Sequence, residues 1–285
     1  FFATIGLNAN IASLRAGGRV VGIFLIVVVG LLLMQNAIGI GMATLLGLDP
    51  LMGLIAGSIT LSGGHGTGAA WSKLFIERYG FTNATEVAMA CATFGLVLGG
   101  LIGGPVARYL VKHSTTPDGM PDDQAVPTAF EKPDVGRIIT SLVLIETIAL
   151  IAICLTVGKV VAQLLAGSAL ELPTFVCVLF VGVLLRNGLV LLRWHEVGER
   201  EVSLLGNVSL SLFLAIALMS LKLWELTALA LPMLVLLTAQ TLAMALYAYF
   251  VTFRVMGRNY DAAVLAAGHC GFGLGDRKST RLNSS

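Results

Sequence analysis

VVGIFLIVVVGLLLMQNAIGIGMATLLGL, residues 20–48, is an uncharged stretch bounded by Arg19 and Asp49. A helix crosses the hydrocarbon core of a bilayer with about 20 consecutive apolar residues, so this stretch is long enough to span a membrane. Similar stretches, two of them interrupted by Glu146 and Arg186 respectively, lie at residues 87–107, 138–158, 172–192, 202–221 and 226–253. Residues 1–14 read as the remnant of one more helix, and the chain is predicted to cross the membrane many times.

The composition supports lipid as the main solvent of this chain. Hydrophobic residues make up 56% of it and charged residues 12%, whereas a soluble domain carries about 25% charged residues. The net charge of +2 gives no reason to expect a nucleic-acid partner. The four cysteines lie apart in apolar stretches, which favours core packing over metal binding.

Two further uncharged runs, at residues 50–72 and 262–275, are rich in glycine. Each glycine costs a helix about 1 kcal/mol relative to alanine, so these runs suit broken or re-entrant helices. Irregular backbone is tolerated at membrane depth only where it is buried in protein or lines a cavity. The predicted fold class is therefore an all-α polytopic membrane protein with two re-entrant glycine-rich loops.

One long polar segment, residues 111–137, contains four of the prolines and is predicted to be an extramembrane loop. Placing this loop in the cytoplasm, with both glycine-rich runs re-entrant, puts most Lys and Arg residues on the cytoplasmic side, as membrane proteins prefer. The predicted organisation is a first helical half (1–110, re-entrant at about 50–72), a cytoplasmic linker (111–137), a second half (138–275, re-entrant at about 262–275) and a non-native tail. That tail, residues 276–285, back-translates to a sequencing-library adaptor.

In this topology the two glycine-rich runs enter the membrane from opposite faces, which suggests an inverted repeat. The sequence supports the repeat weakly: GHG at 64–66 recurs as GHCG at 268–271, and QN at 35–36 recurs as QT at 240–241. Interrupted hydrophobic segments at corresponding positions of two halves indicate the binding site of a secondary transporter. We therefore expect an inverted-repeat secondary transporter.

The motif SGGHGT at residues 62–67 carries the chemistry that such a site needs. Backbone N–H groups at a half-helix N-terminus suit a carboxylate, while hydroxyls and free carbonyls suit Na⁺. Close helix packing through small residues is the competing interpretation. The predicted sodium ligands are Ser62 and Thr67, and the predicted substrate-binding residues are Gly63, Gly64, His65, Gly66, Gly268, His269, Cys270, Gly271 and Gly273.

Four polar residues inside apolar stretches could support this site. Glu146 is an intramembrane carboxylate, for which a functional and a structural role stay equally open. Gln35, Asn36 and Gln240 are expected to hydrogen-bond across helices, with lining of the site as the alternative. A further pattern, glycine at every fourth position from Gly95, predicts tight helix packing.

The motifs GGHGT at 63–67 and GHCGFG at 268–273, the polar loop and FFATIGLN at 1–8 resemble the bacterial sodium/glutamate symporter family over residues 1–275. The resemblance implies two inverted five-helix halves and Na⁺-driven import of L-glutamate through the bacterial inner membrane. It also implies a homodimer in membrane lipid, with Na⁺ as coupling ion and no cofactor. Against the family pattern we expect helices to be missing at both ends, so that this piece alone would not transport.

Three alternatives follow from the residues. A Na⁺-coupled transporter of another small carboxylate would need the same features. An ion channel with a glycine-loop filter is disfavoured because filters repeat one carbonyl ring, and the two motifs differ. An intramembrane enzyme is disfavoured because no HExxH motif or serine–histidine pairing lies in a spanning helix. Concentrative, Na⁺-dependent uptake would separate a transporter from the other two classes.

Overall fold

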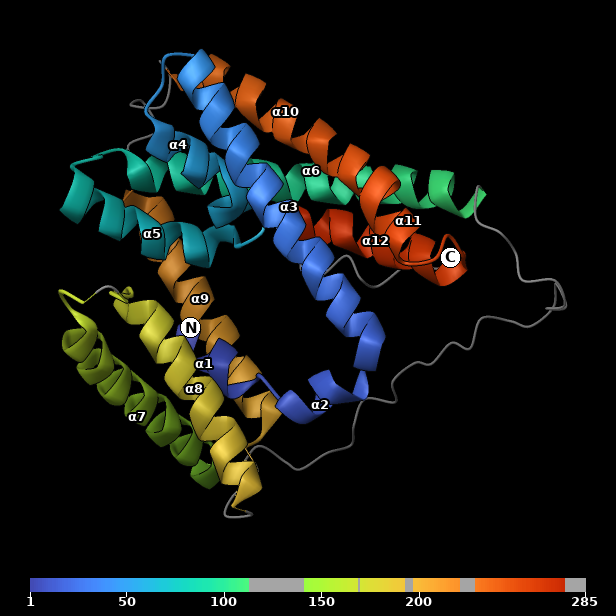
Figure 1. Cartoon of the computed structure of the whole chain (residues 1–285). Helices are drawn as coiled ribbons and strands as arrows, with labels where there is room; N and C mark the ends of the chain where they lie inside the picture. Colours follow the sequence, from blue (N-terminus) through green and yellow to red (C-terminus); the bar gives the residue numbers. More distant parts are fainter. Residues whose placement is uncertain (113–140, 169, 193–196, 221–228, 275–285) are drawn as a thin grey trace, which may run out of the picture. The chain divides into compact units, whose positions relative to one another are not determined.

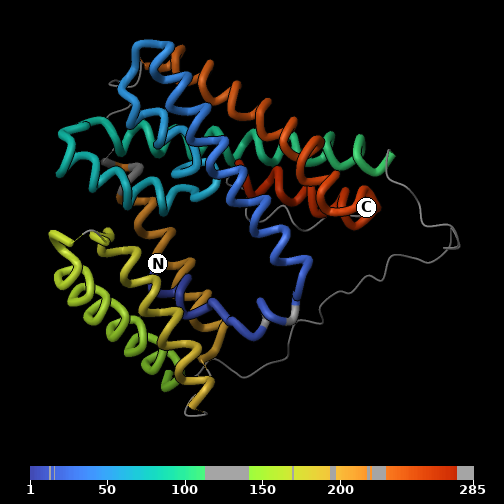
Figure 2. The backbone as a smooth tube through the Cα atoms, in the orientation of Figure 1, coloured from blue at the N-terminus to red at the C-terminus, as the bar shows by residue number. Residues whose placement is uncertain are grey.

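The computed structural model describes residues 1–112, 141–168, 170–192, 197–220 and 229–274, and these residues are helical apart from short turns (Figures 1 and 2). They form two compact units. Unit 1 consists of Phe1–Ala16 and Pro117–Phe213, and unit 2 of Gly17–Thr116 and Leu214–Ser285. Each unit therefore combines segments from both predicted halves. Nearly all of the predicted linker and the whole predicted tail lie outside the described residues.

Five helices among the described residues are long and apolar enough to cross a membrane. They are α3 (Gly18–Leu45), α6 (Ala84–Lys112), α7 (Ser141–Leu165), α8 (Thr174–Leu191) and the continuous stretch Ala230–Val255, which comprises α10 (Ala230–Tyr247), the π-turn η3 (Ala248–Thr252) and α11 (Phe253–Val255). Large apolar side chains on them are exposed, Leu33 by 67% and Leu164 by 78%, as expected of surfaces that face lipid. The predicted polytopic class is confirmed.

The first fourteen residues differ from the single helix remnant that the sequence suggested. They form two short helices, α1 (Phe2–Leu7) and α2 (Ile11–Ala16), with Asn8, Ala9 and Asn10 between them. The Asn10 side chain accepts a hydrogen bond from the Ala12 N–H at 2.9 Å. Asparagine competes with the helix for backbone partners in this way, and the apolar run breaks there.

Unit 1 packs α1, α7 and α8 through small residues and also contains most of α9 (Glu199–Ser220). A Cβ atom built on Gly6 would lie 2.3 Å from the Leu179 carbonyl oxygen, and one on Gly158 would lie 2.6 Å from the Val178 Cα. Backbone atoms cannot yield to such contacts, so glycine is required for helices to approach this closely.

Unit 2 contains α3, α6 and α10 together with shorter helices. These are α4 (Pro50–Leu54), extended by the π-turn η1 (Ile55–Ile59), then α5 (Gly64–Tyr79) and α12 (Tyr260–Gly273). Side-chain caps start α4 and α12, because Asp49 accepts from the Leu51 N–H and Asn259 from the Ala262 N–H. The 14 residues of α12 reach about 21 Å, less than a bilayer core of about 30 Å.

The two glycine-rich runs behave differently within unit 2. The first run is broken twice, at Gly57, whose φ of −95° and ψ of −134° are not helical, and at Gly64, whose φ is +75°. The second run is a regular helix up to Gly273 and ends at Leu274, despite its glycines.

The close packing predicted for the α6 glycines is present at Gly95, where it involves α12. A Cβ atom on Gly95 would lie 2.9 Å from the Leu274 carbonyl oxygen, whereas one on Gly103 would lie 4.0 Å from the Ala267 carbonyl oxygen and would fit. The missing side chain of Gly95 lets the C-terminal end of α12 rest against α6.

Candidate functional site

Gln35, near the middle of α3, joins the two glycine-rich runs. Its Nε2 donates to the Gly273 carbonyl oxygen at 2.8 Å, and its Oε1 accepts from the Ser62 hydroxyl at 2.7 Å. The Gln35 side chain is fully buried. The end of α12 and the turn that precedes α5 therefore meet at one amide group inside unit 2.

Asn36, the next residue of α3, stabilises the first break. The backbone conformation at Gly57 interrupts the helix, and Asn36 Oδ1 accepts from the backbone N–H of Ser58 at 3.1 Å and from its hydroxyl at 2.8 Å. A Cβ atom on Gly57 would lie 3.0 Å from this oxygen. The side chain thus supplies an acceptor where helical geometry is lost. Ser58 was not among the predicted site residues, although its place directly after a glycine in the run was a usable signal.

Gln240 of α10 completes the polar cluster. Its Nε2 donates to the Gln35 backbone carbonyl at 2.7 Å, whereas its Oε1 is buried and has no hydrogen-bond partner among the described residues. Buried polar atoms without partners are rare in folded proteins. The expected bonds of Gln35, Asn36 and Gln240 across helices are all present, and one acceptor remains unused.

The N-terminus of α5 lies directly after the Ser62–Gly63 turn. Its N-cap residue is Gly63, which has no side chain to accept from the N–H groups of the first turn. A Cβ atom at Gly63 would lie 2.4 Å from the Ile59 carbonyl oxygen, so the turn admits only glycine. The Thr67 hydroxyl donates to the Gly63 carbonyl at 3.0 Å. The positive pole of α5 and the negative pole of α12 are therefore linked through Ser62 and Gln35.

The two predicted histidines have different surroundings. The half-buried His65 is within hydrogen-bond distance of the Thr93 hydroxyl through Nε2, at 3.1 Å. His269 is 1% exposed, with Nδ1 2.9 Å from the Thr252 hydroxyl and its ring centroid 5.1 Å from that of Phe24. His269 therefore packs among side chains of α3 and η3, one turn before the end of α12.

The two glycine–histidine motifs also occupy different positions in their helices. Residues 64–66 open α5, whereas residues 268–271 lie inside α12, where Cys270 is fully buried. The residue of α12 that contacts Gln35 is Gly273, which the sequence motif did not distinguish from its neighbours.

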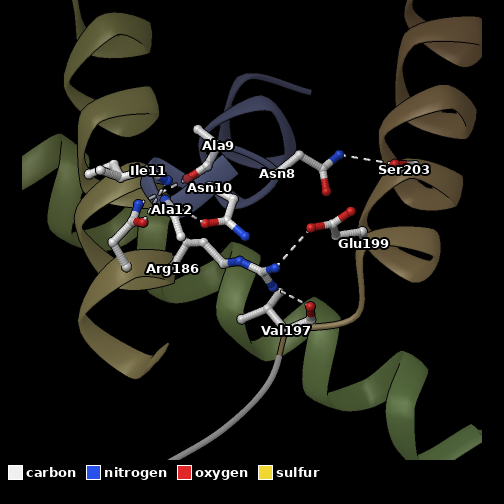
Figure 3. Close-up of polar contacts among 10 residues, drawn as sticks. Asn8, Ala9, Asn10, Ile11, Ala12, Arg186, Val197, Glu199 and Ser203 are labelled. Carbon is white, nitrogen blue, oxygen red and sulfur yellow. Dashed lines mark hydrogen bonds and ion pairs between the residues drawn. The ribbon is translucent and has the colours of Figure 1, made fainter. Parts of the chain in front are cut away.

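A separate polar cluster lies in unit 1, at the turn between α1 and α2 (Figure 3). The buried Arg186 of α8 donates to the Val197 carbonyl oxygen and to Glu199 Oε1, the latter at 3.0 Å. Asn187 donates to the Ala9 carbonyl at 2.9 Å and accepts from the Ile11 N–H at 3.0 Å. The Asn187 bonds attach the turn to α8, and the Arg186 bonds attach α8 to the segment where α9 begins. The sequence did not predict either set.

Glu146, the remaining predicted polar residue, lies on α7 of unit 1 and is half-buried. The glycine motifs, Gln35, Asn36 and Gln240 all belong to unit 2. The structure thus brings three of the four predicted polar residues together with both motifs in one compact unit and assigns Glu146 to the other.

Known proteins resemble this chain over nearly its whole length. Residues 1–283 match the protein family described as the sodium/glutamate symporter. Sodium/glutamate symporters from Escherichia coli strain K12 and Shigella flexneri are each 87% identical over 275 residues, 96% of this chain and 69% of those proteins. The sodium/glutamate symporter from Haemophilus influenzae is 50% identical over 277 residues, with the same coverage. No solved structure matches the chain.

Proposed function

This chain belongs to the sodium/glutamate symporter family, and we propose that unit 2 contains the site where Na⁺ and L-glutamate bind. The chain is a multi-pass transporter of the bacterial inner membrane and not an enzyme, with Na⁺ as its coupling ion. Neither another carboxylate nor a channel function has support from its relatives. The observation that carries the site is the Gln35 amide, which links Ser62 to Gly273.

The first turn of α5 is the proposed binding point for a substrate carboxylate. Its N–H groups begin at Gly64, directly after the N-cap residue Gly63, and Gly64 and Gly66 leave two of the first three positions without a side chain. An uncapped helix N-terminus has donors and a partial positive charge to offer an anion. His65, in the same turn, is proposed to form the edge of the site that faces Thr93.

Na⁺ is proposed to bind beside the end of α12. The Gly273 carbonyl and the hydroxyls of Ser62 and Thr67 supply oxygens, and each hydroxyl uses its hydrogen in a bond to the protein. A hydroxyl whose hydrogen is engaged still has lone pairs for a cation. Within α12, Gly273 is the residue proposed to contact ligand, and Gly268, His269, Cys270 and Gly271 form the helix wall behind it.

An inverted repeat with two re-entrant loops is the proposed architecture. In each half a spanning helix, α3 or Ala230–Val255, is followed by a short helix with an Asx cap, α4 or α12. Those helices all lie in unit 2. The helices that come before them in the two halves, α1 in the first and α9 in the second, lie wholly or mostly in unit 1. This recurrence in both halves, and the short length of the capped helices, support the proposal.

The remaining organisation is proposed from the family resemblance and the charge pattern. Residues 1–110 and 138–275 form the two halves, residues 111–137 connect them in the cytoplasm, and two copies form a homodimer. Contact with lipid is supported by exposed apolar side chains on α7, among them Leu142 at 65% and Leu164 at 78%.

Uptake of labelled glutamate tests the function directly. The complete coding sequence is expressed, and membrane vesicles receive an inward gradient of Na⁺, K⁺ or choline. We expect glutamate to accumulate above its external concentration with Na⁺ alone. Equal accumulation with K⁺ would contradict Na⁺ coupling, and entry that stops at equal concentrations would favour the channel alternative.

A further inference from the structure

We infer that Gln35 is a positioning residue that couples Na⁺ binding to glutamate binding. This inference rests on the function proposed above, because it concerns the same site. Gln35 has one amide with a donor end and an acceptor end. The donor end holds the end of α12 through Gly273, and the acceptor end holds the turn before α5 through Ser62.

The acceptor end, Gln35 Oε1, determines how the Ser62 hydroxyl can bind a cation. A hydroxyl has one hydrogen and two lone pairs. Because the Ser62 hydrogen points at Gln35 Oε1, 2.7 Å from the hydroxyl oxygen, the lone pairs point elsewhere and can accept Na⁺. Without Gln35 the hydroxyl could rotate and direct its hydrogen toward the ion, which would weaken binding.

The same contact fixes the backbone that would receive the carboxylate. Ser62 and Gly63 form the turn that leads into α5, so an ion held at Ser62 also orders the first N–H groups of that helix. The donor end of Gln35 meanwhile keeps the Gly273 carbonyl beside this turn. Binding of Na⁺ and binding of the carboxylate then share one ordered geometry, and each favours the other.

The position of Gln35 is itself held firmly. Its backbone carbonyl accepts from Gln240 at 2.7 Å, and the adjacent Asn36 holds Ser58 at the first break. The side chain is fully buried, so water does not replace either partner. An amide fixed at both ends in this way transmits a shift of one partner to the other.

The test compares Gln35→Met, which keeps the side-chain length and removes both hydrogen bonds, with wild type in the complete coding sequence. The control is Gln163→Met, at an exposed position of α7 in unit 1. The KM for glutamate is measured in vesicles over a series of Na⁺ concentrations. In wild type and in the control we expect the KM to fall as Na⁺ rises.

In Gln35→Met we expect the half-saturating Na⁺ concentration to rise about tenfold, the effect of losing the one hydrogen bond that orients the Ser62 hydroxyl. The dependence of the glutamate KM on Na⁺ should weaken as well. A variant that only transports more slowly, in proportion to its amount in the membrane and with unchanged dependence on Na⁺, would show that Gln35 is merely structural and would overturn the inference.

If Gln35→Met does not reach the membrane, Gln35→Asn decides by the same measurement. Its shorter amide cannot span both partners, so a wild-type dependence on Na⁺ in that variant also overturns the inference. Failure of the wild type itself to require Na⁺ would refute the proposed function instead, which keeps the two outcomes distinguishable.

Discussion

At the scale of single residues, Gly64 is the position where the first broken helix depends most on backbone conformation. Its φ of +75° is costly for residues with a Cβ atom, by about 1–2 kcal/mol, although nothing lies within 4 Å of a Cβ built there. Strain, not steric collision, is therefore the reason that glycine is needed.

This distinction predicts a ranking of Gly64 variants. Asparagine tolerates positive φ better than alanine does, so Gly64→Asn should transport better than Gly64→Ala despite its larger side chain. Initial rates of Na⁺-driven glutamate uptake, normalised to protein in the membrane, provide the measurement. Alanine equal to or better than asparagine would show that side-chain size, not φ, limits this position.

A second prediction concerns the Ser62 hydroxyl. Ser62→Ala removes one proposed ligand oxygen without adding bulk, and the half-saturating Na⁺ concentration should rise about tenfold. Thr44→Ala serves as control, because the Thr44 hydroxyl is exposed and donates to the Ile40 carbonyl of its own helix, at 2.8 Å. An equal Na⁺ requirement in wild type and Ser62→Ala would remove Ser62 from the sodium site.

At the scale of helices, the crossing of α3 and α4 determines where along α3 the first broken helix packs. Gly39 and Gly53 face each other there: a Cβ atom on Gly39 would lie 2.1 Å from the Gly53 carbonyl oxygen, and one on Gly53 would lie 2.3 Å from the Gly39 carbonyl oxygen. Since both neighbours are backbone atoms, only a shift of a whole helix would make room.

Gly39→Ala should therefore lower both the Tm in detergent and the rate of uptake, because separating α3 from α4 displaces the break that Asn36 holds. Gly41→Ala is the matched control on the same helix, where nothing lies within 4 Å of the added atom. That variant should keep or raise the Tm, since alanine favours a helix over glycine by about 1 kcal/mol. Similar Tm values for both variants would contradict the assigned crossing.

At the scale of the whole molecule, neither compact unit is a continuous piece of chain. Unit 2 takes its helices from Gly17–Thr116 and Leu214–Ser285, on either side of most of unit 1 in the sequence. The proposed site uses α3 and α5 from the first of these segments and α10 and α12 from the second. Neither segment alone contains the complete site.

The proposed topology can be tested with single cysteines at two exposed positions, Tyr79 at the end of α5 and Lys112 at the end of α6. The positive-inside pattern puts Tyr79 outside and Lys112 in the cytoplasm. In intact cells an impermeant thiol reagent should label Tyr79→Cys and not Lys112→Cys. The native cysteines are all buried and should contribute no background. Labelling of Lys112→Cys alone would show that the topology is the opposite of the proposed one.

The sequence alone determined the features that depend on local composition. The spanning helices follow from uncharged length, because a bilayer imposes one apolar solvent on every residue that crosses it. The break at Gly64 follows from glycine itself, since its φ of +75° is a conformation that other residues avoid. The family also followed from short motifs, and the matching relatives confirm it.

The partners of the buried polar groups were decided only by the tertiary structure. Gln35 bonds to Ser62, 27 residues away, and to Gly273, 238 residues away, whereas the motif at 268–271 proved to lie inside a regular helix. Nothing local distinguishes Gly273 from the glycines before it. Which carbonyl an amide meets depends on how α3, α6 and α12 pack together, and that packing is settled by contacts along whole helices, not by the residues next to the bond.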